Sequence, residues 1–317
     1  MLKTGYYTHP ACRMHEMGAG HPECPERLDA IQERLSASGL DLTLKQLQAP
    51  AATFEDVALA HDEGFIDHLR QTSREMIENH SSDSYAYAYL DPDTAMNSHT
   101  LDAVMFSAGA AIAATDAVIK GDIANAFCAV RPPGHHAMRK KAMGFCFFNT
   151  VAVAVKHAIH QHGLERVAVV DFDVHHGNGT EDIFANDNQV LMVGFFQHPF
   201  YPYSGSEKSA SNMVNIPVPA RTNGAAVREL IENDWVPRLE EFKPEMIFIS
   251  AGFDAHREDD LGQMRLNEQD YSWMTQRICE IAQRHAQGRI VSCLEGGYNL
   301  SALARSVEAH LRVLADL

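Results

Sequence analysis

Near the middle of the chain stands Val167-Ala168-Val169-Val170-Asp171-Phe172-Asp173-Val174-His175-His176-Gly177-Asn178-Gly179-Thr180, a short apolar run followed directly by carboxylates, imidazoles and glycines. The apolar part, taken as far as Phe172, has the length and β-branched content of a buried strand. Four similar runs recur along the chain, at Ala124–Val130, Val190–Phe195, Met246–Ser250 and Arg289–Leu294. The segments between them have helical spacing and length, so the alternation predicts an α/β fold with a parallel sheet and helices on both faces.

Six stretches between or beside these runs have the period and length of helices. They are Pro25–Ser38, Ser98–Lys120, Thr150–His162, Ala225–Glu241, Asn267–Ala286 and Leu300–Leu317. Asn79–Thr94 is polar and aromatic without a clear period, and we expect a long surface loop there. No internal repeat and no linker rich in proline, glycine or serine divides the sequence, so we expect one domain over residues 1–317.

The composition limits the class of protein and its partners. The chain has 317 residues, 45% of them hydrophobic, which is enough for a large core, and a formal net charge of -16. Because no run of lysine or arginine offsets that charge, nucleic acid and anionic membranes are poor partners. The sequence has no apolar stretch of about 18 residues and no signal-peptide pattern, so we expect a soluble, cytoplasmic protein. The six cysteines are scattered without a CxxC pair, which predicts reduced thiols.

Side chains suited to a metal ion follow two of the predicted strands. If Asp171, Asp173 and His175 continue the strand, their spacing of two residues puts all three on one face. Asp254 stands just after the run Met246–Ser250, and the carboxyl ends of parallel strands meet at one edge of a sheet. Asp173, His175 and Asp254 would then supply three ligands, the number that a catalytic zinc takes while one position stays open. Fe(II), Co(II) and Mn(II) accept the same ligands, and the alternative without a metal is a polar loop with helix caps.

Groups suited to acid–base and oxyanion chemistry follow two other runs. Arg131–Ala137 is a turn stiffened by two prolines, and it carries the adjacent imidazoles His135 and His136. A neutral imidazole held there can take a proton from an attacking water and pass it to a leaving amine. After Arg289–Leu294, a glycine-rich loop leads to Tyr298, whose hydroxyl can donate a hydrogen bond to a developing oxyanion. Structural packing is the alternative for the histidine pair and for the tyrosine.

These motifs together carry a family resemblance. The chain resembles the histone deacetylases and acetylpolyamine amidohydrolases of the arginase/deacetylase fold, and in particular the bacterial class II-type histone deacetylase-like amidohydrolases. The matching blocks keep their order along nearly the whole chain: His21–Leu28, Arg131–Ala137, Gly144–Asn149, Asp171–Thr180, Ser250–Asp254 and Glu295–Tyr298. The resemblance implies a single α/β domain with an eight-stranded parallel sheet, and a hydrolase that removes an acetyl group from an amine.

The resemblance also implies a role for each group at the strand ends. One zinc ion per chain would be bound by Asp173, His175 and Asp254. His136 would be the general base and acid, with His135 beside it as electrostatic partner, and Tyr298 would polarise the acetyl carbonyl. Asp171 would support His135 from behind, and Asn178 would support His136. Some branches have aspartate in place of Asn178, so the amide should leave His136 less basic.

A narrow tunnel for the acyl-lysine chain is a further part of the resemblance. Phe145 would form one wall, suited to the methylene chain of a lysine or polyamine. Gly144, Leu261 and Gly296 correspond to other positions along the tunnel, and Tyr201 corresponds to its second aromatic, where a tyrosine would give a polar rim.

The resemblance also implies two features beside the site, a region where acetate leaves and a potassium ion. Arg27 resembles the arginine that borders the region where acetate leaves. Many relatives have Ser-Leu-His where this chain has Gly194-Phe195-Phe196, so a potassium ion near Asp171 would lose one hydroxyl ligand. Backbone carbonyls could still hold K+ there.

The substrate class is less directly indicated. Polyamine-selective relatives of one type carry an acidic residue where Leu261 stands, which favours an acetylated lysine of a protein or peptide over an acetylpolyamine or another small acyl-amine. Two alternatives belong to other classes: a non-catalytic protein that binds an acylated ligand, and a two-metal hydrolase like the arginases. The arginases need more carboxylate ligands than we can place here. A homo-oligomer is compatible with the sequence.

Overall fold

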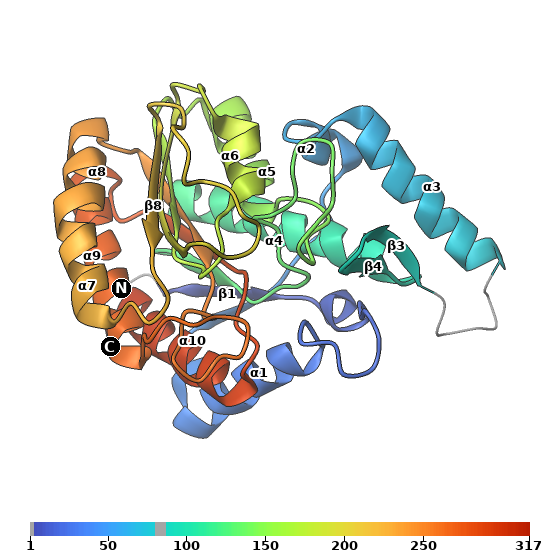
Figure 1. Ribbon diagram of the computed structural model, residues 1–317, viewed down its shortest axis with the longest axis horizontal. Coiled ribbons are helices and arrows are strands. Elements are labelled where there is room, and N and C mark those ends of the chain that lie inside the picture. Colours follow the sequence, from blue (N-terminus) through green and yellow to red (C-terminus); the bar gives the residue numbers. More distant parts are fainter. Residues whose placement is uncertain (1–2, 80–86) are drawn as a thin grey trace.

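The computed structural model describes residues 3–79 and 87–317 and is built on one eight-stranded sheet (Figure 1). The strand order is β2-β1-β5-β10-β9-β6-β7-β8, and every pair of neighbours is parallel. The strands are β1 Gly5–Thr8, β2 Lys45–Gln48, β5 Ala126–Cys128, β6 Val167–Asp171, β7 Val190–Gln197, β8 Met213–Val218, β9 Met246–Ala251 and β10 Ile290–Leu294. The predicted α/β fold with a parallel sheet is therefore confirmed.

Each of the five predicted runs forms one of the central strands, and β1, β2 and β8 were not predicted. All residues of β6 are buried, because helices cover both faces of a parallel sheet and its strands become continuous apolar runs. The outermost strand β2 reads Lys-Gln-Leu-Gln and is mostly exposed, so it carries no such signal. β8 at the other edge is only partly buried and contains Pro217, a residue that edge strands tolerate.

The predicted helices are present, with shifted ends in most cases. They correspond to α1 Glu26–Ser38, α4 Thr100–Lys120, α5 Thr150–His162, α9 Glu268–His285 and α10 Leu300–Leu314. The stretch Ala225–Glu241 is not one regular helix, since a π-helical turn at Ile231–Trp235 separates two short helices, α7 Gly224–Leu230 and α8 Val236–Phe242. Elements outside the prediction are α2 Phe54–Ala58, α3 Glu63–Asn79, α6 Asn178–Phe184 and the 3-10 turns Pro10–Arg13 and Leu40–Leu42.

The expectation of a loop over Asn79–Thr94 is wrong in part. Helix α3 runs to Asn79, and a hairpin of β3 Ala88–Asp91 and β4 Thr94–Met96 occupies the other end of the stretch, while residues 80–86 lie outside the described part of the chain. All three residues of β4, Thr94, Ala95 and Met96, are buried, so this short strand packs against the core.

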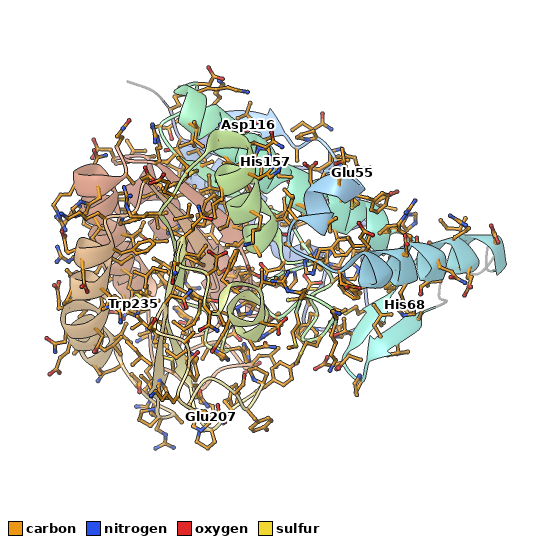
Figure 2. All side chains as sticks on the ribbon, turned by 90° about the horizontal axis from the view of Figure 1, so that it is seen from above. Glu55, His68, Asp116, His157, Glu207 and Trp235 are labelled. Carbon is orange, nitrogen blue, oxygen red and sulfur yellow. The ribbon has the colours of Figure 1, made fainter. Side chains whose placement is uncertain are left out.

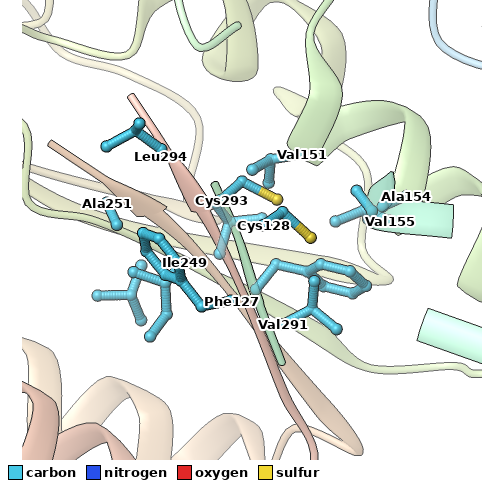
Figure 3. Close-up of a cluster of buried hydrophobic side chains, with 14 of the residues drawn as sticks. Phe127, Cys128, Val151, Ala154, Val155, Ile249, Ala251, Val291, Cys293 and Leu294 are labelled. Carbon is cyan, nitrogen blue, oxygen red and sulfur yellow. The ribbon is translucent and has the colours of Figure 1, made fainter. Parts of the chain in front are cut away.

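Helices cover both faces of the sheet (Figure 1). Helices α1 and α9 both pack on α10, and α4 packs on α5. Alternate side chains of β10 mark the two faces: Ser292 contacts His310 of α10, whereas Cys293 and its neighbour Cys128 of β5 face Val151 of α5 (Figure 3). All six cysteines are free thiols.

Helix α4 is a core helix. By length and composition alone it could cross a membrane, the one such helix in the described ranges, but 61% of its most apolar window is buried inside the fold. Both α4 and α5 end at a glycine in the left-handed conformation, Gly121 (φ 77°) and Gly163 (φ 67°), a cap that lets the backbone leave the helix without strain.

One buried histidine should make the stability depend on pH. His310 of α10 is buried between the hydroxyls of Thr275 (2.7 Å to Nδ1) and Ser292 (2.9 Å to Nε2), and burial lowers its pKa to about 3 from 6.5. As the pH falls below 6.5, the imidazole of His310 becomes protonated in the unfolded chain but stays neutral in the folded chain. The free energy of unfolding should therefore lose about 1.4 kcal/mol per pH unit from this group, between its unfolded and folded pKa values.

The measurement is urea unfolding at several pH values between 7 and 5 for the wild type and for His310→Gln, which keeps a polar side chain without the titration. The variant should show the shallower dependence of unfolding free energy on pH. Equal slopes for the two proteins would contradict this account of His310.

Candidate active site

Four of the predicted functional segments come together at one edge of the sheet. Strands β5, β10, β9 and β6 are neighbours in that order and run in parallel, so their carboxyl ends share an edge. The segments that follow them carry the histidine pair, the glycine-rich loop with Tyr298, Asp254 and the Asp171–Thr180 stretch. Convergence at the carboxyl edge is the general rule for sites in open parallel sheets.

The three candidate ligands Asp173, His175 and Asp254 form one cluster. Nδ1 of His175 lies 3.0 Å from Oδ1 of Asp173 and 3.2 Å from Oδ2 of Asp254. The expected extended geometry is wrong, because β6 ends at Asp171 and the chain turns there. Asp173 accepts a hydrogen bond from the backbone N–H of His175 (2.9 Å), whereas Asp171 points away, to His135. A turn, not the strand period, therefore brings Asp173 and His175 together.

The charges of this cluster fit a bound cation. Two buried carboxylates face each other across it, and both contact the single Nδ1 of His175, at 3.0 Å from Asp173 and 3.2 Å from Asp254. Burial, together with the charge of Asp173, raises the pKa of Asp254 to about 7. Burial alone would lower the pKa of His175, but hydrogen bonds with both carboxylates raise it to about 10. A divalent ion would neutralise both carboxylates and take the place of the proton that His175 shares with them, so the donor set suits a metal.

Two glycines allow the loops to approach these carboxylates. A Cβ on Gly252 would overlap the carboxylate of Asp173, and one on Gly296 would overlap those of Asp254 and Asp173. The N–H of Gly296 donates to Oδ2 of Asp173 (2.9 Å) and orients it. Gly296 thus contacts the carboxylates and is not among the residues that line the cavity described below, in contrast to its predicted place in the tunnel.

The adjacent histidines have different partners and opposite electrostatic tendencies. Nδ1 of His135 lies 3.0 Å from Oδ2 of Asp171, and Nδ1 of His136 lies 2.7 Å from Oδ1 of Asn178. For His135, burial lowers the pKa, but Asp173 and Asp171 outweigh it and hold the pKa well above its usual value. Burial and the neighbouring cations hold the pKa of His136 well below its usual value. His136 is therefore the neutral member of the pair.

The tautomer of His136 follows from its partner. The amide oxygen of Asn178 can only accept, and the amide nitrogen of the same side chain faces Sδ of Met143 at 3.4 Å. Nδ1 of His136 consequently carries the proton, which leaves a lone pair on Nε2. Asp171 and Asn178 thus lie where the predicted supporting roles require them.

A buried glutamate that the sequence analysis did not single out holds the histidine turn. The carboxylate of Glu295 accepts hydrogen bonds from the N–H groups of Gly134 (2.6 Å) and His135 (3.1 Å) and from the hydroxyl of Ser250 (3.2 Å). Pro132 and Pro133 have no N–H, so Glu295 binds the first two backbone donors after them. The position of the histidines therefore depends on the loop that also carries Tyr298.

Arg27 is fully buried beneath that loop. Its nitrogens donate to the carbonyl oxygens of Gly297 (2.7 Å) and Glu295 (2.5 Å) and to the carboxylate of Glu23 (3.0 Å), and its guanidinium lies 5.0 Å from the ring centre of Tyr298. These contacts fix the loop. The place of Arg27 beside the acetate-release region stays a prediction.

Glu23 links two buried arginines and should be important for stability. Its two oxygens receive Nε and Nη2 of Arg131 at 2.7 and 2.6 Å, in addition to the contact from Arg27. Glu23→Gln removes the charge that compensates both, so we expect a loss of about 3–5 kcal/mol in unfolding free energy. Urea unfolding measures this, with the exposed Glu33→Gln on α1 as control, where a change within about 0.5 kcal/mol is expected. Equal effects of the two variants would contradict the role of Glu23.

A cavity of about 220 Å³ opens onto the cluster. Its lining residues are Asp93, His136, Gly144, Phe145, His175, Phe200, Tyr201, Asp260, Leu261 and Tyr298. Four of the five predicted tunnel residues are among them, and Phe200, Asp93 and Asp260 were missed. The ring of Phe200 stacks on His175, with centroids 5.5 Å apart, and the ring of Phe145 meets Tyr298 edge-on at 5.9 Å. The cavity thus has aromatic walls beside His136 and the candidate ligand His175.

The polar part of the cavity differs from the expected one. The hydroxyl of Tyr201 is buried, with no hydrogen-bond partner in residues 3–79 and 87–317, so it does not give a polar rim. Burial raises the pKa of this hydroxyl far above its usual value, with Asp93 adding to the effect. The acidic residues of the lining, Asp93 and Asp260, stand beside the polar residues His136, His175 and Tyr298. The carboxylates could not be assigned to the cavity from the sequence, because Asp93 lies in the turn of a hairpin outside the main sheet and Asp260 lies in the loop after β9.

Backbone conformation at one turn shapes the cavity wall. Gly144 (φ 58°) and Phe145 (φ 68°) are both left-handed, and the N–H of Phe145 donates to Oγ1 of Thr94 (3.1 Å). A Cβ on Gly144 would overlap the ring of His136, so only glycine lets this wall approach that imidazole. A strained non-glycine residue such as Phe145 is typical of functional sites.

Gly194, which replaces a hydroxyl-bearing residue of many relatives, lies next to Asp171. Residue Gly194 of β7 is the direct strand neighbour of Asp171, so no side-chain hydroxyl is available from that position. Binding of K+ by backbone carbonyls near Asp171 stays a prediction.

Comparison with known proteins identifies the family. The histone deacetylase domain family matches residues 21–314. The chain is 37% identical over 288 residues to a histone deacetylase-like amidohydrolase of Pseudomonas aeruginosa, covering 89% of this chain and 73% of that protein. It is 35% identical over 307 residues to a probable deacetylase of Archaeoglobus fulgidus, covering 94% and 82%.

The chain belongs to the histone deacetylase family. Among solved structures, the HDA15 HD domain superimposes with a TM-score of 0.91 at 32% identity, covering 99% of this chain and 88% of that one. Membership of the histone deacetylase family makes the chain a hydrolase that acts on amide bonds. The family is generally metal-dependent, and the cluster of Asp173, His175 and Asp254 is a candidate metal site.

Proposed function

We propose that the chain hydrolyses the amide of N-acetyl-lysine in a protein or peptide to lysine and acetate, with one zinc ion held by Asp173, His175 and Asp254. One observation carries the proposal: a neutral imidazole, His136, lies beside a buried three-ligand cluster, and His136 and the ligand His175 line one cavity with aromatic walls. Deacetylation needs these parts together, since an amide carbonyl must be polarised, attacked by water and its nitrogen protonated.

The ligand set supports zinc without excluding Fe(II) or Co(II). Two carboxylates and one imidazole leave a coordination position open, as catalytic zinc sites do. When bound there, zinc would polarise the acyl carbonyl and lower the pKa of the attacking water. Removal of metal with a chelator should abolish turnover, and added Zn2+ should restore it.

His136 is proposed to move the proton. Its Nδ1–H is engaged by Asn178, so Nε2 takes the proton of the attacking water and afterwards gives it to the leaving amine. The low pKa of His136 keeps Nε2 free at neutral pH. His135, paired with Asp171, adds a nearby positive charge that opposes protonation of His136 and thereby makes the protonated form a better acid.

Tyr298 is proposed to donate a hydrogen bond to the carbonyl oxygen as it gains charge. Burial holds the pKa of its hydroxyl well above the usual value, so the proton stays available. The loop that carries Tyr298 is fixed by the contacts of Arg27 and by the backbone N–H of Tyr298 itself, which donates to Asp259 (2.6 Å). Such fixation keeps the donor in place before the reaction.

The residues that line the cavity indicate which substrate class it can accept. Phe145, Phe200 and Leu261 offer apolar surface to the four methylenes of a lysine side chain. An acetylpolyamine is the second candidate, because the carboxylates of Asp93 and Asp260 on the same cavity would attract its further amines.

The deciding experiment compares a fluorogenic acetyl-lysine peptide with acetylputrescine and acetylspermidine, using metal-replete protein. We expect the peptide to be hydrolysed with the higher kcat/KM. A marked preference for the polyamines would overturn the substrate assignment. If none of the three is turned over, the deacetylase proposal fails and a protein that only binds acylated ligands becomes the better account.

A further inference from the structure

A second cluster of metal-ligating side chains lies outside the active site. Asp116 of α4 faces His157 and His162 of α5, and one ligand atom from each lies within 4.8 Å of the others. Nε2 of His157 is 2.8 Å, and Nε2 of His162 is 2.7 Å, from the same oxygen, Oδ1 of Asp116. Asp116 and His157 can be seen side by side near one edge of Figure 2. Two imidazoles and one carboxylate are the ligand types that divalent transition metals prefer.

The cluster and the active site lie at opposite edges of the sheet. Asp116 is near the end of α4, which leads into β5, and His162 is the last residue of α5, which leads into β6. These helix ends therefore lie beside the amino ends of the strands, whereas the active site is built at their carboxyl ends. The two sets of ligands share no residue.

The three side chains are already positioned. The side chains of His157 and His162 are 10% and 19% exposed, and that of Asp116 is 33% exposed, so the cluster is shielded but open to water on one side. Nδ1 of His157 has no hydrogen-bond partner within the described residues, so the polar contacts of that ring are directed to Asp116. Two packed helices hold the ligands, and little further ordering is needed to bind an ion.

The surrounding charges favour a cation on balance. Helices α4 and α5 both end here, at Gly121 and Gly163, and the partial negative charge of helix carboxyl ends attracts cations. The nearby cation, Lys120, lies 3.8 Å from Oδ2 of Asp116, not from the oxygen that faces the histidines. Its side chain is 61% exposed and free to turn into solvent, so its repulsion of a bound ion is screened.

We propose that Asp116, His157 and His162 form an accessory metal site that takes Zn2+, or Co2+ or Ni2+ in its place, and ties the carboxyl ends of α4 and α5 together. Three protein ligands leave water to complete the coordination shell. Binding displaces the protons that the imidazoles share with Asp116, so the hydrogen-bonded cluster is the metal-free form of the site.

Metal stoichiometry tests the proposal. Chelator-stripped protein is dialysed against Zn2+, and bound zinc per chain is measured by elemental analysis. One ion is expected at each of the two clusters, so the wild type should bind two, and His162→Gln and Asp116→Asn should each bind one. His160→Gln is the matched control, because His160 is on the same helix but outside the cluster, and it should still bind two.

The two sites can be told apart. Asp254→Asn should lose the ion of the active site and keep the accessory one, while Asp254→Asn combined with His162→Gln should lose both. His162→Gln should keep the wild-type turnover of an acetyl-lysine peptide. Circular dichroism checks that the variants fold, and if Asp116→Asn does not, His162→Gln decides alone. The accessory site would be overturned by a wild type that binds only one ion, or by a second ion that is lost in His160→Gln and kept in His162→Gln. A chain that binds two ions but does not deacetylate the peptide would overturn only the proposed function.

Discussion

Replacing His136 with alanine is expected to lower kcat/KM for an acetyl-lysine peptide by about 100-fold to 10,000-fold. His136 lines the cavity, and Asn178 engages its Nδ1, which leaves Nε2 to accept the proton and return it. Zinc content should remain unchanged, because His136 is not among the three candidate ligands. Steady-state kinetics together with elemental analysis measure both quantities.

The matched control for this variant is His68→Ala, since His68 is exposed on α3 far along the chain from the site. It should keep full activity. If His136→Ala retained more than about one tenth of the wild-type kcat/KM, the proton would have to move through another group, and the assigned role of His136 would be wrong.

Replacing Tyr298 with phenylalanine is expected to lower kcat by about 100-fold to 1,000-fold with a small change in KM. The substitution removes one hydroxyl and leaves the ring that contacts Phe145 and Arg27, so packing of the loop is preserved. A hydrogen bond that forms mainly with the developing oxyanion affects the transition state more than the bound substrate.

Tyr89→Phe is the control for the loss of a hydroxyl, because Tyr89 is 69% exposed on β3. It should behave as the wild type. A Tyr298→Phe variant with an unchanged kcat and a raised KM would show that the hydroxyl binds the ground state, which contradicts its assignment to oxyanion stabilisation.

Much of the fold could be predicted because its central elements have strong local signals. The helix Thr150–His162 was predicted to the residue, since the side chain of Asn149 caps its start and Gly163 ends it. The exposed edge strand Lys45–Gln48 could not be predicted, because its pairing with β1 is a long-range contact without an apolar pattern. The π-helical turn at Ile231–Trp235 was missed for a similar reason: Trp235 is buried in the tertiary core, and helical periodicity does not reveal a bulge.

The site residues that directly follow a strand of the main sheet could be predicted, whereas those that reach the cavity from other loops could not. Asp254 follows β9, and its place in the cluster could be inferred from the parallel order alone. Asp93 and Asp260 reach the cavity from loops whose path no periodicity encodes. Likewise, the sequence does not show that the loop at Gly296 approaches the carboxylates of Asp173 and Asp254 and not the cavity wall.

The central claim is that one zinc ion, bound by Asp173, His175 and Asp254, supports hydrolysis of acetyl-lysine. The direct measurement is a titration of chelator-stripped His162→Gln protein with Zn2+, in which acetate released from an acetyl-lysine peptide is followed at each addition; this variant keeps the active-site ligands and removes the accessory cluster. Activity should be absent without metal, rise in proportion to added zinc and level off at one ion per chain, and Asp254→Asn in the same background should stay inactive. Acetate release without metal, release that is unaffected by Asp254→Asn, or no release at any zinc level would contradict the claim.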